Sequence, residues 1–568
     1  MADSDDRAGG RAGFASGRLG VIAAVSLLAC AAVASAWALA HLECWAEDEA
    51  GTLWQASDIL AGRVHRLGLV SSTGIRNMIG APLVAVPFAW LPDLLAISRA
   101  LSAVHLAALC PLGLLIGRTP IEKVLAVAVL WFNPALVLSS FSLWNQYLAR
   151  LASVAILALL LYLLLERGGA KRRALAVLAY AALALLQPAI HLVHFPDLAI
   201  HLVLLLAVLR MRPAPLDARL IKGGAMLLAF IVPQLYGPWW FDTAGRLDAG
   251  ALRTVTLLAV AAGAAIALLA WYGPARVVER GRALRQWPAL APLAAALFCF
   301  TLPAVLFFSF AGAQVVRRLL KSELPAIFGL LVVQVAIAVA VLPLLAALWA
   351  ALRTRRGALL TALEGDRAPI AALLLGYAAL LVAARLALGV MPWSRGDLWV
   401  SLTPAFLASA LVLLQSHGRL YRPVAALTAG AAVLLLGWLA VNGPGVRYRQ
   451  LYTAVVPASE MREAIDWIAA RHRAEAGGDQ VDLGYDLGTG KEWIPRRVTR
   501  HPAFRWYSIG RPYDWLLRRR HGLANLHEGE VDRMRGEDFL LSFRDQPPES
   551  ADWTEMKSFD RLVVWRHR

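Results

Sequence analysis

Three consecutive acids, Glu47, Asp48 and Glu49, follow the first long apolar run of the chain. A carboxylate at the edge of a membrane-type segment is costly to remove from water, so such a cluster is a candidate functional site. Carboxylates in this setting can take a proton from an attacking hydroxyl or amine, or they can ligate a cation. A solvated loop without chemistry is the alternative that these residues leave open.

Two arginines, Arg76 and Arg395, lie in segments that we expect on the same side of the membrane as the acids. A guanidinium stabilises the negative charge of a leaving phosphate, so both are candidate phosphate binders. Contact with lipid headgroups is the alternative for either side chain.

A histidine-rich segment lies between two apolar runs. His191, His194, Asp197 and His201 share one helical face if Pro196 does not interrupt the helix. Such a stripe could bind a metal or a phosphate, and hydrogen-bonded histidines at the membrane interface are the alternative.

The composition is that of an integral membrane protein, so we expect membrane helices to position these residues. The chain has 568 residues, of which 59% are hydrophobic and 17% charged, and its mean hydropathy is +0.58. These values exclude an ordinary soluble protein. The net charge of +17 fits cytoplasmic loops and anionic headgroups, so we expect a lipid bilayer and no nucleic acid as partner.

The sequence predicts an α-helical polytopic membrane protein with about 13 transmembrane helices, each near the roughly 20 apolar residues that a bilayer requires. The candidate spans are 19–40, 94–117, 122–140, 147–165, 172–187, 190–210, 220–238, 251–272, 287–310, 325–352, 368–391, 398–416 and 423–441.

Basic and non-basic connecting segments alternate, and the positive-inside rule puts the basic set in the cytoplasm. The N-terminal tail 1–18 is then cytoplasmic, and the first loop 41–80 is extracytoplasmic. Segment 81–92 is short and holds two internal prolines, so we expect a re-entrant or interfacial hairpin and no crossing. The basic segment 317–325 breaks the alternation and suggests an interfacial helix. Within the first loop, 48–63 suits a helix lying on the membrane surface.

The C-terminal region 442–568 follows the transmembrane domain 19–441 and is expected outside as a small α/β domain. Its segment 460–475 predicts an amphipathic helix, and three others predict short strands. The strand segments are 480–488, 537–545 and 560–568. GYDLGTGK at 484–491 lacks the spacing of an ATP-binding phosphate loop.

An acidic pair, a proline-containing segment and a C-terminal region follow one another in this chain, and this arrangement resembles that of the GT-C superfamily. The matching residues are Asp48-Glu49, Ala81-Pro82 and 442–568. These polytopic glycosyltransferases use polyprenyl-phosphate-linked sugars and include protein O-mannosyltransferases and aminoarabinose transferases. Asn145-Gln146-Tyr147-Leu148 resembles the family's Gly-Gln-x-Asp, with asparagine for glycine and leucine for the acid. The resemblance therefore implies a GT-C-like fold in which the second extracytoplasmic carboxylate is missing.

The resemblance implies a membrane glycosyltransferase that moves a sugar from a polyprenyl-phosphate donor to an extracytoplasmic lipid, glycan or protein acceptor. Asp48 is the expected general base, and Glu47 and Glu49 either orient it or bind a metal. The expected cofactor is a divalent metal ion at Asp48 and Glu49. Asn145 and Gln146 are expected to contact substrate, together with Arg76, Arg395, His191 and His194. The expected location is a bacterial inner membrane.

Two other functions stay open on the sequence. A transporter or flippase for lipid-linked glycans is the first, although no internal repeat is visible and few charges lie within the spans. Arg385 is one such charge. The second is a scaffold of the same architecture that binds lipid-linked sugar without catalysis, as the missing acid at Leu148 would allow.

Overall fold

The computed structural model describes residues 5–40, 47–63, 65–69, 76–141, 143, 145–165, 169–211, 218–246, 370, 373–374, 376–378, 380–381, 384, 402–415, 418–442, 456, 458–486, 511–526, 538–544, 547–548 and 552–568. The predicted spans 251–272, 287–310 and 325–352 lie outside these residues, as do segment 317–325 and most of 368–391.

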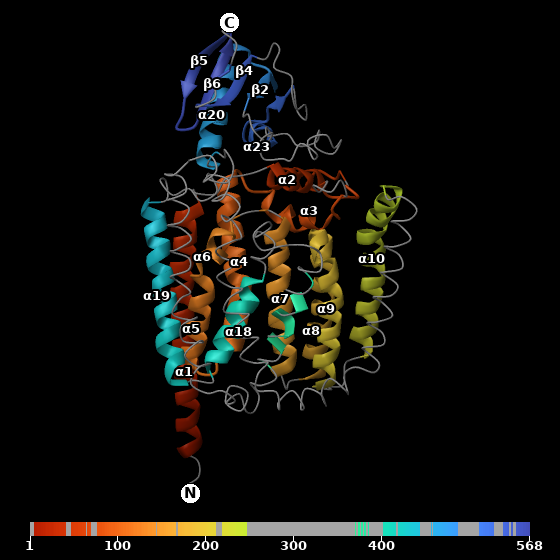
Figure 1. The fold of residues 1–568 in the computed structure, drawn as a ribbon, viewed down its shortest axis with the longest axis vertical. Coiled ribbons are helices and arrows are strands. Elements are labelled where there is room, and N and C mark those ends of the chain that lie inside the picture. The colour runs from red at the N-terminus through yellow and green to blue at the C-terminus, as the bar shows by residue number, and fades with distance from the viewer. Residues whose placement is uncertain are drawn as a thin grey trace, which may run out of the picture.

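Apolar helices standing side by side make up most of the described structure (Figure 1). Five of the described helices are long and apolar enough to cross a membrane, namely Leu19–Leu39, Leu94–Ile116, Tyr147–Leu165, Ala170–Ile190 and Arg419–Gly437. The predicted helical membrane architecture is therefore confirmed in these parts, whereas the total of about 13 spans stays a prediction. The bundle contains α1 (Asp5–Leu39), α4 (Leu94–Ile116), α5 (Pro120–Trp131), α7 (Asn145–Leu165), α8 (Ala170–Ile190), α9 (Phe195–Met211), α10 (Ala218–Arg246), α18 (Thr403–Gln415) and α19 (Gly418–Asn442).

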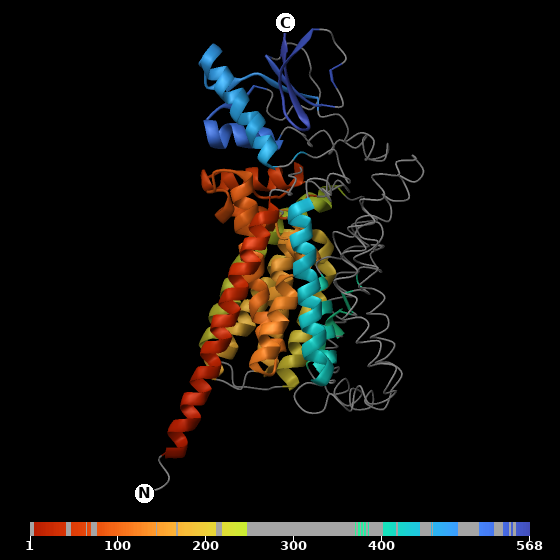
Figure 2. The ribbon, with the colours of Figure 1, turned by 90° about the vertical axis from the view of Figure 1, so that its left-hand side faces the viewer.

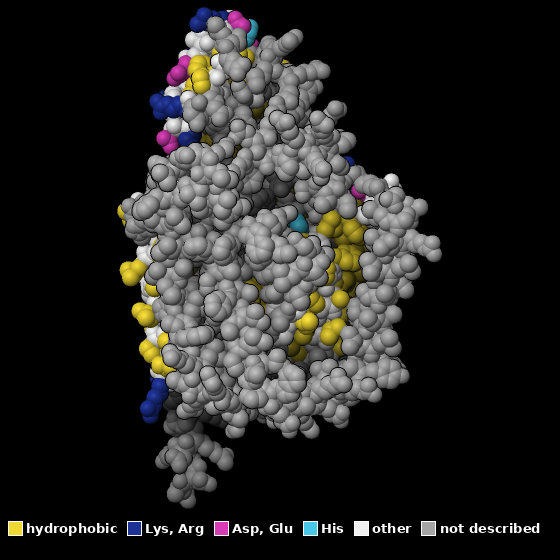
Figure 3. All heavy atoms as spheres, in the orientation of Figure 1, with side chains coloured by type: hydrophobic (Ala, Val, Ile, Leu, Met, Phe, Trp, Pro, Cys, Tyr) yellow, Lys and Arg dark blue, Asp and Glu magenta, His cyan; other side chains and the backbone are white. Residues whose placement is uncertain are grey.

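The outer faces of the bundle carry exposed apolar side chains. On α10, Met226 and Phe241 are 75% and 78% exposed, and Leu434 on α19 is 76% exposed. Figure 3 shows apolar side chains along α19 and basic side chains near its lower end. Apolar surface of this extent is unfavourable in water and favourable in hydrocarbon, so we assign these faces to lipid.

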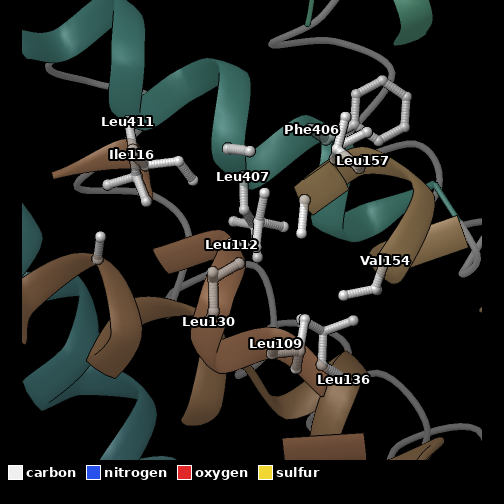
Figure 4. Close-up of a cluster of buried hydrophobic side chains, with 14 of the residues drawn as sticks. Leu109, Leu112, Ile116, Leu130, Leu136, Val154, Leu157, Phe406, Leu407 and Leu411 are labelled. Carbon is white, nitrogen blue, oxygen red and sulfur yellow. The ribbon is translucent and has the colours of Figure 1, made fainter. Parts of the chain in front are cut away.

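Branched apolar side chains fill the centre of the bundle (Figure 4). Leu109 of α4, Leu130 of α5 and Leu407 of α18 belong to one buried cluster. At the far end of α4, the Gln415 side-chain amide donates to the Ile116 carbonyl at 2.9 Å. These two residues are 299 positions apart in sequence, so the helices near both ends of the membrane domain share one core.

The predicted span 122–140 is not a continuous helix. α5 ends at Trp131, and a separate short helix, α6 (Pro134–Leu138), follows it. The Asn133 side chain accepts a hydrogen bond from the Leu136 backbone N–H at 3.2 Å and so begins α6. Pro134 has no N–H with which to continue α5, which explains why an apolar run of spanning length divides in two.

The first loop contains the predicted surface helix, α2 (Glu47–Leu60), which lies across one end of the bundle (Figure 2). The proline-containing segment forms α3 (Gly80–Ala85) and one 3-10 turn, η2 (Val86–Phe88). Neither piece is long enough to span a bilayer, as the sequence predicts. The chain then enters α4, where the Asp93 side chain accepts from the Ala96 N–H at 2.8 Å as an N-cap.

Gly80 allows α3 to touch the end of α8. A Cβ atom at this position would lie 2.5 Å from the carbonyl carbon of Ala189 and 2.7 Å from the backbone nitrogen of Ile190. Backbone atoms cannot give way as the end of a side chain can, so only glycine fits. The close approach holds the first loop against the bundle.

The C-terminal region contains the predicted helix, α20 (Ala458–Glu475), and a four-stranded sheet in the order β2-β4-β6-β5. β2 and β4 are parallel, whereas β4–β6 and β6–β5 are antiparallel. The three predicted strand segments are confirmed. The strands are β1 (Gln480–Val481), β2 (Leu483–Asp486), β3 (Ala524–Asn525), β4 (Phe539–Phe543), β5 (Trp553–Ser558) and β6 (Leu562–His567), and β1 pairs with β3.

Between the strands lie α23 (Arg511–Leu516) and a π-helical turn, η6 (Leu517–His521). Figure 1 shows the C-terminal region beyond α2, at the end of the bundle opposite the N-terminus. The first loop and the C-terminal region therefore lie on one side, as the charge pattern predicts. Which side faces the cytoplasm stays a prediction.

Replacing Gly80 by alanine should separate α3 from α8, because the new methyl group collides with backbone. We expect Gly80→Ala to lower the free energy of unfolding by about 1–3 kcal/mol. Gly430→Ala is the matched control, since Gly430 lies within α19 and a Cβ there would meet nothing within 4 Å. Thermal unfolding in detergent measures both. Equal melting temperatures for the two variants would contradict the close approach.

Candidate functional site

The helix α2 begins with the three predicted acids. Glu49 is fully buried, and it shares its face with buried Thr52, Leu53 and Ala56. The first turn of a helix carries unpaired N–H groups and a partial positive charge, which stabilise a carboxylate. The side chains of Glu47 and Asp48 lie outside the described residues, so the role of Asp48 as base stays a prediction.

A hydrogen bond joins this face of α2 to the start of α7. The Thr52 hydroxyl donates to the Asn145 side-chain oxygen at 3.3 Å, and both residues are buried. Thr52 comes one helical turn after Glu49, so the structure brings the predicted substrate residue Asn145 close to the acids. Gln146 is the second residue of α7, and its side chain lies outside the described residues.

Leu148 occupies the position at which the resemblance would have a second acid. Its side chain is fully buried in an apolar cluster that also contains Leu53, Leu143 and Ile190. A carboxylate in this cluster would lose its hydration, at a cost of several kcal/mol. The leucine therefore contributes to packing beneath α2 in place of the missing acid.

Arg76 is half-buried in the first loop, next to the point where the loop pairs with itself. There the Gly68 N–H donates to the Asn77 carbonyl at 2.9 Å, and the Asn77 N–H donates to the Leu69 carbonyl at 2.7 Å. The Nε atom of Arg76 is buried and has no hydrogen-bond partner among the described residues. Its Nε–H group is therefore a donor that no described residue uses. Arg395 and Arg385 lie outside the described residues.

The prediction that His191 shares a helical face with the other histidines is wrong. α8 ends at Ile190, His191 is extended with φ −150° and ψ 128°, and a 3-10 turn, η3 (Leu192–His194), follows. The His191 ring accepts from the Val193 N–H at 3.2 Å, so it caps this turn. Pro196 lies in the first turn of α9, where its missing N–H is tolerated. The break therefore precedes the proline.

His194, Asp197 and His201 do come together, in a buried hydrogen-bonded network with Gln187. His194 Nδ1 lies 2.8 Å from Asp197 Oδ2, and His201 Nε2 lies 2.7 Å from the Gln187 side-chain oxygen. The Gln187 amide also donates to Ser153 of α7. These contacts favour the hydrogen-bonded alternative for the histidines.

The described residues contain no group of three histidine, cysteine, aspartate or glutamate side chains that could hold a metal ion. At the first turn of α2, Glu49 is the one acid whose side chain is described. The divalent metal ion expected at Asp48 and Glu49 therefore stays a prediction, and no step of the chemistry below is assigned to it.

The sequence interpretation overlooked a buried cation. Arg150 of α7 is 2% exposed and contacts His105 of α4 and Ser139. The sequence does place this arginine in the first turns of a predicted span. Burying a charge within a span is energetically unfavourable, and such charges are associated with function, so the position alone marks Arg150 as a candidate.

The C-terminal region shares an apolar cluster with the first loop. Leu53 of α2 and Leu148 of α7 belong to the same buried cluster as Ile465 of α20, Leu516 of α23 and Val564 of β6. This cluster couples the membrane domain to the C-terminal region, since separating the two would expose apolar surface to water. The C-terminal region is therefore docked on α2.

Polar contacts fix the position of this docking. The Trp515 indole N–H donates to the Ser57 hydroxyl of α2 at 3.2 Å, and the Arg518 guanidinium lies 5.0 Å from the centre of the Trp54 ring. The Arg519 guanidinium donates to the Trp90 carbonyl at 2.6 Å. Contacts of this kind depend on orientation, so they set where the region lies against α2.

Ion pairs join the same region to the start of α4. Arg462 and Arg520 each lie 3.7 Å from the Asp93 carboxylate. Arg520 also donates two hydrogen bonds to Asp466, at 3.0 and 2.9 Å, and His521 lies 2.8 Å from the same carboxylate. Partial burial raises the pKa of Asp466, but the hydrogen bonds and the positive charges of Arg520 and His521 together lower it more, so this pKa lies below its ordinary value.

The sequence matches no family model and no curated protein. Among solved structures, the chain is similar to ArnT from Cupriavidus metallidurans bound to undecaprenyl phosphate, with a TM-score of 0.43 and 11% identity, over 95% of this chain and 97% of that one. The two chains superpose loosely and share little sequence.

The lowered pKa of Asp466 predicts a pH-dependent contribution to stability. A carboxylate with a lowered folded-state pKa stabilises the fold above its unfolded pKa of about 3.9 and loses that contribution as the pH falls through the lower value. Asp466→Asn should therefore destabilise the C-terminal region at pH 7, by about 1 kcal/mol or less because the pair is partly exposed. The difference from wild type should shrink below about pH 4.

Thermal unfolding at pH 7 and pH 3 tests this expectation. Glu463→Gln is the control, because Glu463 is exposed on the same helix. Asp466→Asn should lower the melting temperature more at pH 7 than at pH 3. An equal decrease at the two pH values, or a decrease at pH 7 no larger than that of Glu463→Gln, would contradict the lowered pKa of Asp466.

Proposed function

We propose that this chain is a membrane glycosyltransferase that moves a sugar from a polyprenyl-phosphate donor to an acceptor on the side of the C-terminal region. The observation that carries the proposal is the acidic first turn of α2, in which Glu49 is fully buried, on a helix that shares an apolar cluster with the bundle and the C-terminal region. A carboxylate removed from water acts in a low dielectric, where its interactions with a reacting group are strong. The order of loop, hairpin and C-terminal region supports the same reaction through the family resemblance.

In the proposed reaction, the acceptor is a hydroxyl or an amine on a lipid, glycan or protein. Asp48 takes the acceptor proton, and the acceptor atom attacks the anomeric carbon. The bond between that carbon and the phosphate oxygen breaks, and its electron pair stays on the lipid phosphate. Glu47 and Glu49 orient the base, and Asn145, held by Thr52, contacts the sugar.

The leaving phosphate gains negative charge, and a cation must stabilise it. Arg76 is the described first-loop candidate, because its Nε is buried without a hydrogen-bond partner in the part of the chain that the structure describes. Arg395 remains a second candidate on the sequence. Which sugar is moved depends on hydrogen bonds to its hydroxyl groups, and the proposal leaves the sugar open.

One observation favours a second candidate function, a scaffold that binds lipid-linked sugar without transferring it. Leu148 is packed in an apolar cluster at the position of the family's second acid. If that acid is required for transfer, the chain would retain binding and lose chemistry. Donor turnover separates the two functions.

The test uses the purified full chain in liposomes with radiolabelled undecaprenyl-phosphate-linked sugars and a lipid extract of the cell envelope as acceptor. We expect release of undecaprenyl phosphate by wild type and a loss of about 10²–10⁴-fold in Asp48→Asn, the range that general-base catalysis contributes. Glu49→Gln and Glu47→Gln should lose less. Asp58→Asn is the matched control, since Asp58 lies in the same helix and pairs with Arg63 and His65.

Activity within tenfold of wild type in Asp48→Asn would overturn Asp48 as base. Absence of turnover in wild type, with retained donor binding, would replace the proposal by the scaffold. Movement of intact labelled donor across the liposome membrane, without turnover, would replace it by the transporter.

A further inference from the structure

The segment between the first loop and α4 is apolar on two faces. Residues 81–92, APLVAVPFAWLP, contain no charged side chain, and they form most of α3, all of η2 and the turn before α4. One face is buried, because Ala85 and Phe88 belong to the cluster that α2 shares with the C-terminal region. The other face is open, with Leu83 and Trp90 42% and 68% exposed. An apolar face of this kind is unfavourable in water and favourable beside hydrocarbon.

The open face lies beside the lipid-facing surface of the bundle. Figure 2 shows α2 and α3 as a layer across the end of the bundle that reaches sideways beyond the end of α1. Trp37, at that end of α1, is 47% exposed, and its indole N–H donates to the Arg99 carbonyl of α4 at 3.3 Å. Arg99 lies five residues after the start of α4, a rise of roughly 7.5 Å. Tryptophan is enriched where a membrane meets water, so Trp37 and Trp90 mark the level of the lipid headgroups.

A basic turn of the C-terminal region lies against this segment. The turn is η6, and it contains three successive arginines, 518–520. Arg520 is held by the carboxylates described above, whereas Arg519 is exposed. The Arg519 guanidinium donates to the Trp90 carbonyl at 2.6 Å and to the Leu91 carbonyl at 3.4 Å. Among the described residues, no carboxylate pairs with Arg519, so its charge is not neutralised.

The contacts of Arg519 leave part of its guanidinium unused. They involve Nε and one terminal nitrogen, and arginine has five N–H donors, so the other terminal nitrogen has no acceptor among the described residues. An exposed cation thus lies against the main chain of an exposed tryptophan. This arrangement suits the headgroup layer of a membrane, where an aromatic ring meets acyl chains and a cation meets acidic headgroups.

We propose that Leu83, Trp90 and Arg519 form a contact with an anionic bilayer surface that holds the C-terminal region on α2. Leu83 and Trp90 enter the edge of the hydrocarbon layer, and Arg519 attracts acidic headgroups. Arg519 belongs to the C-terminal region and Trp90 to the membrane domain, so a bilayer that binds both residues stabilises the association of the two parts. This contact needs no sugar transfer and does not depend on the proposed function.

The experiment compares the full chain in nanodiscs of phosphatidylcholine with the full chain in nanodiscs that also contain phosphatidylglycerol, an anionic lipid. The readout is the amide hydrogen-exchange rate of 511–526, which reports how firmly this part of the C-terminal region is docked. The variants are Arg519→Gln, Arg519→Lys and Trp90→Ala.

Arg473→Gln is the matched control. Arg473 is also exposed, and it also donates to a backbone carbonyl of η6, that of His521, at 2.8 Å. It lies eleven residues after Arg462, the α20 residue that pairs with Asp93, and so roughly 16.5 Å further along the helix. Figure 1 shows α20 rising away from the bundle, so this arginine lies farther from the headgroups than Arg519 does.

In wild type we expect phosphatidylglycerol to slow the exchange of 511–526 about fivefold, the effect of one arginine near an anionic surface. Arg519→Gln should lose this dependence, whereas Arg519→Lys and Arg473→Gln should keep it. Trp90→Ala should exchange faster in both membranes with the ratio between them retained, because apolar insertion does not depend on headgroup charge. High salt should reduce the ratio in wild type, because salt screens the attraction.

Equal exchange of wild type in the two membranes would overturn the inference. An Arg519→Gln variant that exchanges faster by the same factor in both membranes would also overturn it, and would leave Arg519 only its bond to the Trp90 carbonyl. A loss of the phosphatidylglycerol effect in Arg473→Gln as complete as in Arg519→Gln would replace the contact by a general effect of net charge. Unchanged exchange in Trp90→Ala would overturn the apolar half of the contact.

Discussion

The helix α2 is packed between the membrane bundle and the C-terminal region, and this packing determines where the acids of the first loop lie. Leu53 belongs to the same buried apolar cluster as Leu148 and Ile190 of the bundle, while Trp54 and Ser57 contact the C-terminal region. Burying a leucine side chain contributes about 1.5–3 kcal/mol, so the shared cluster holds α2, and with it the buried Glu49, in place.

This packing also couples parts of the chain that are distant in sequence. Asp93 begins α4 and receives Arg462 and Arg520 from the C-terminal region. A displacement of that region would break these ion pairs, expose the shared cluster and release α2 from above. The C-terminal region therefore supports the acidic helix through these contacts.

Local periodicity was enough to predict α2, α20 and the strands β2, β4 and β6, because each has a regular pattern of apolar residues. Interruptions were harder to predict. The break at Asn133 depends on a side-chain cap, and the break at His191 precedes Pro196. Arg150 was missed because its meaning depends on neutral partners from α4 and α6, which only helix packing brings together. The sequence shows a leucine at position 148 where the resemblance has an acid, but only helix packing shows that this leucine is buried beneath α2.

We propose that α2 covers a site for a lipid phosphate linked to a sugar, and a cryo-EM map of the full chain with undecaprenyl phosphate can locate that phosphate. We expect phosphate density beneath α2, within reach of the Arg76 guanidinium, with α2 and the C-terminal region still in contact. Lipid density confined to the outer faces of the bundle, with none beneath α2, would overturn the proposal.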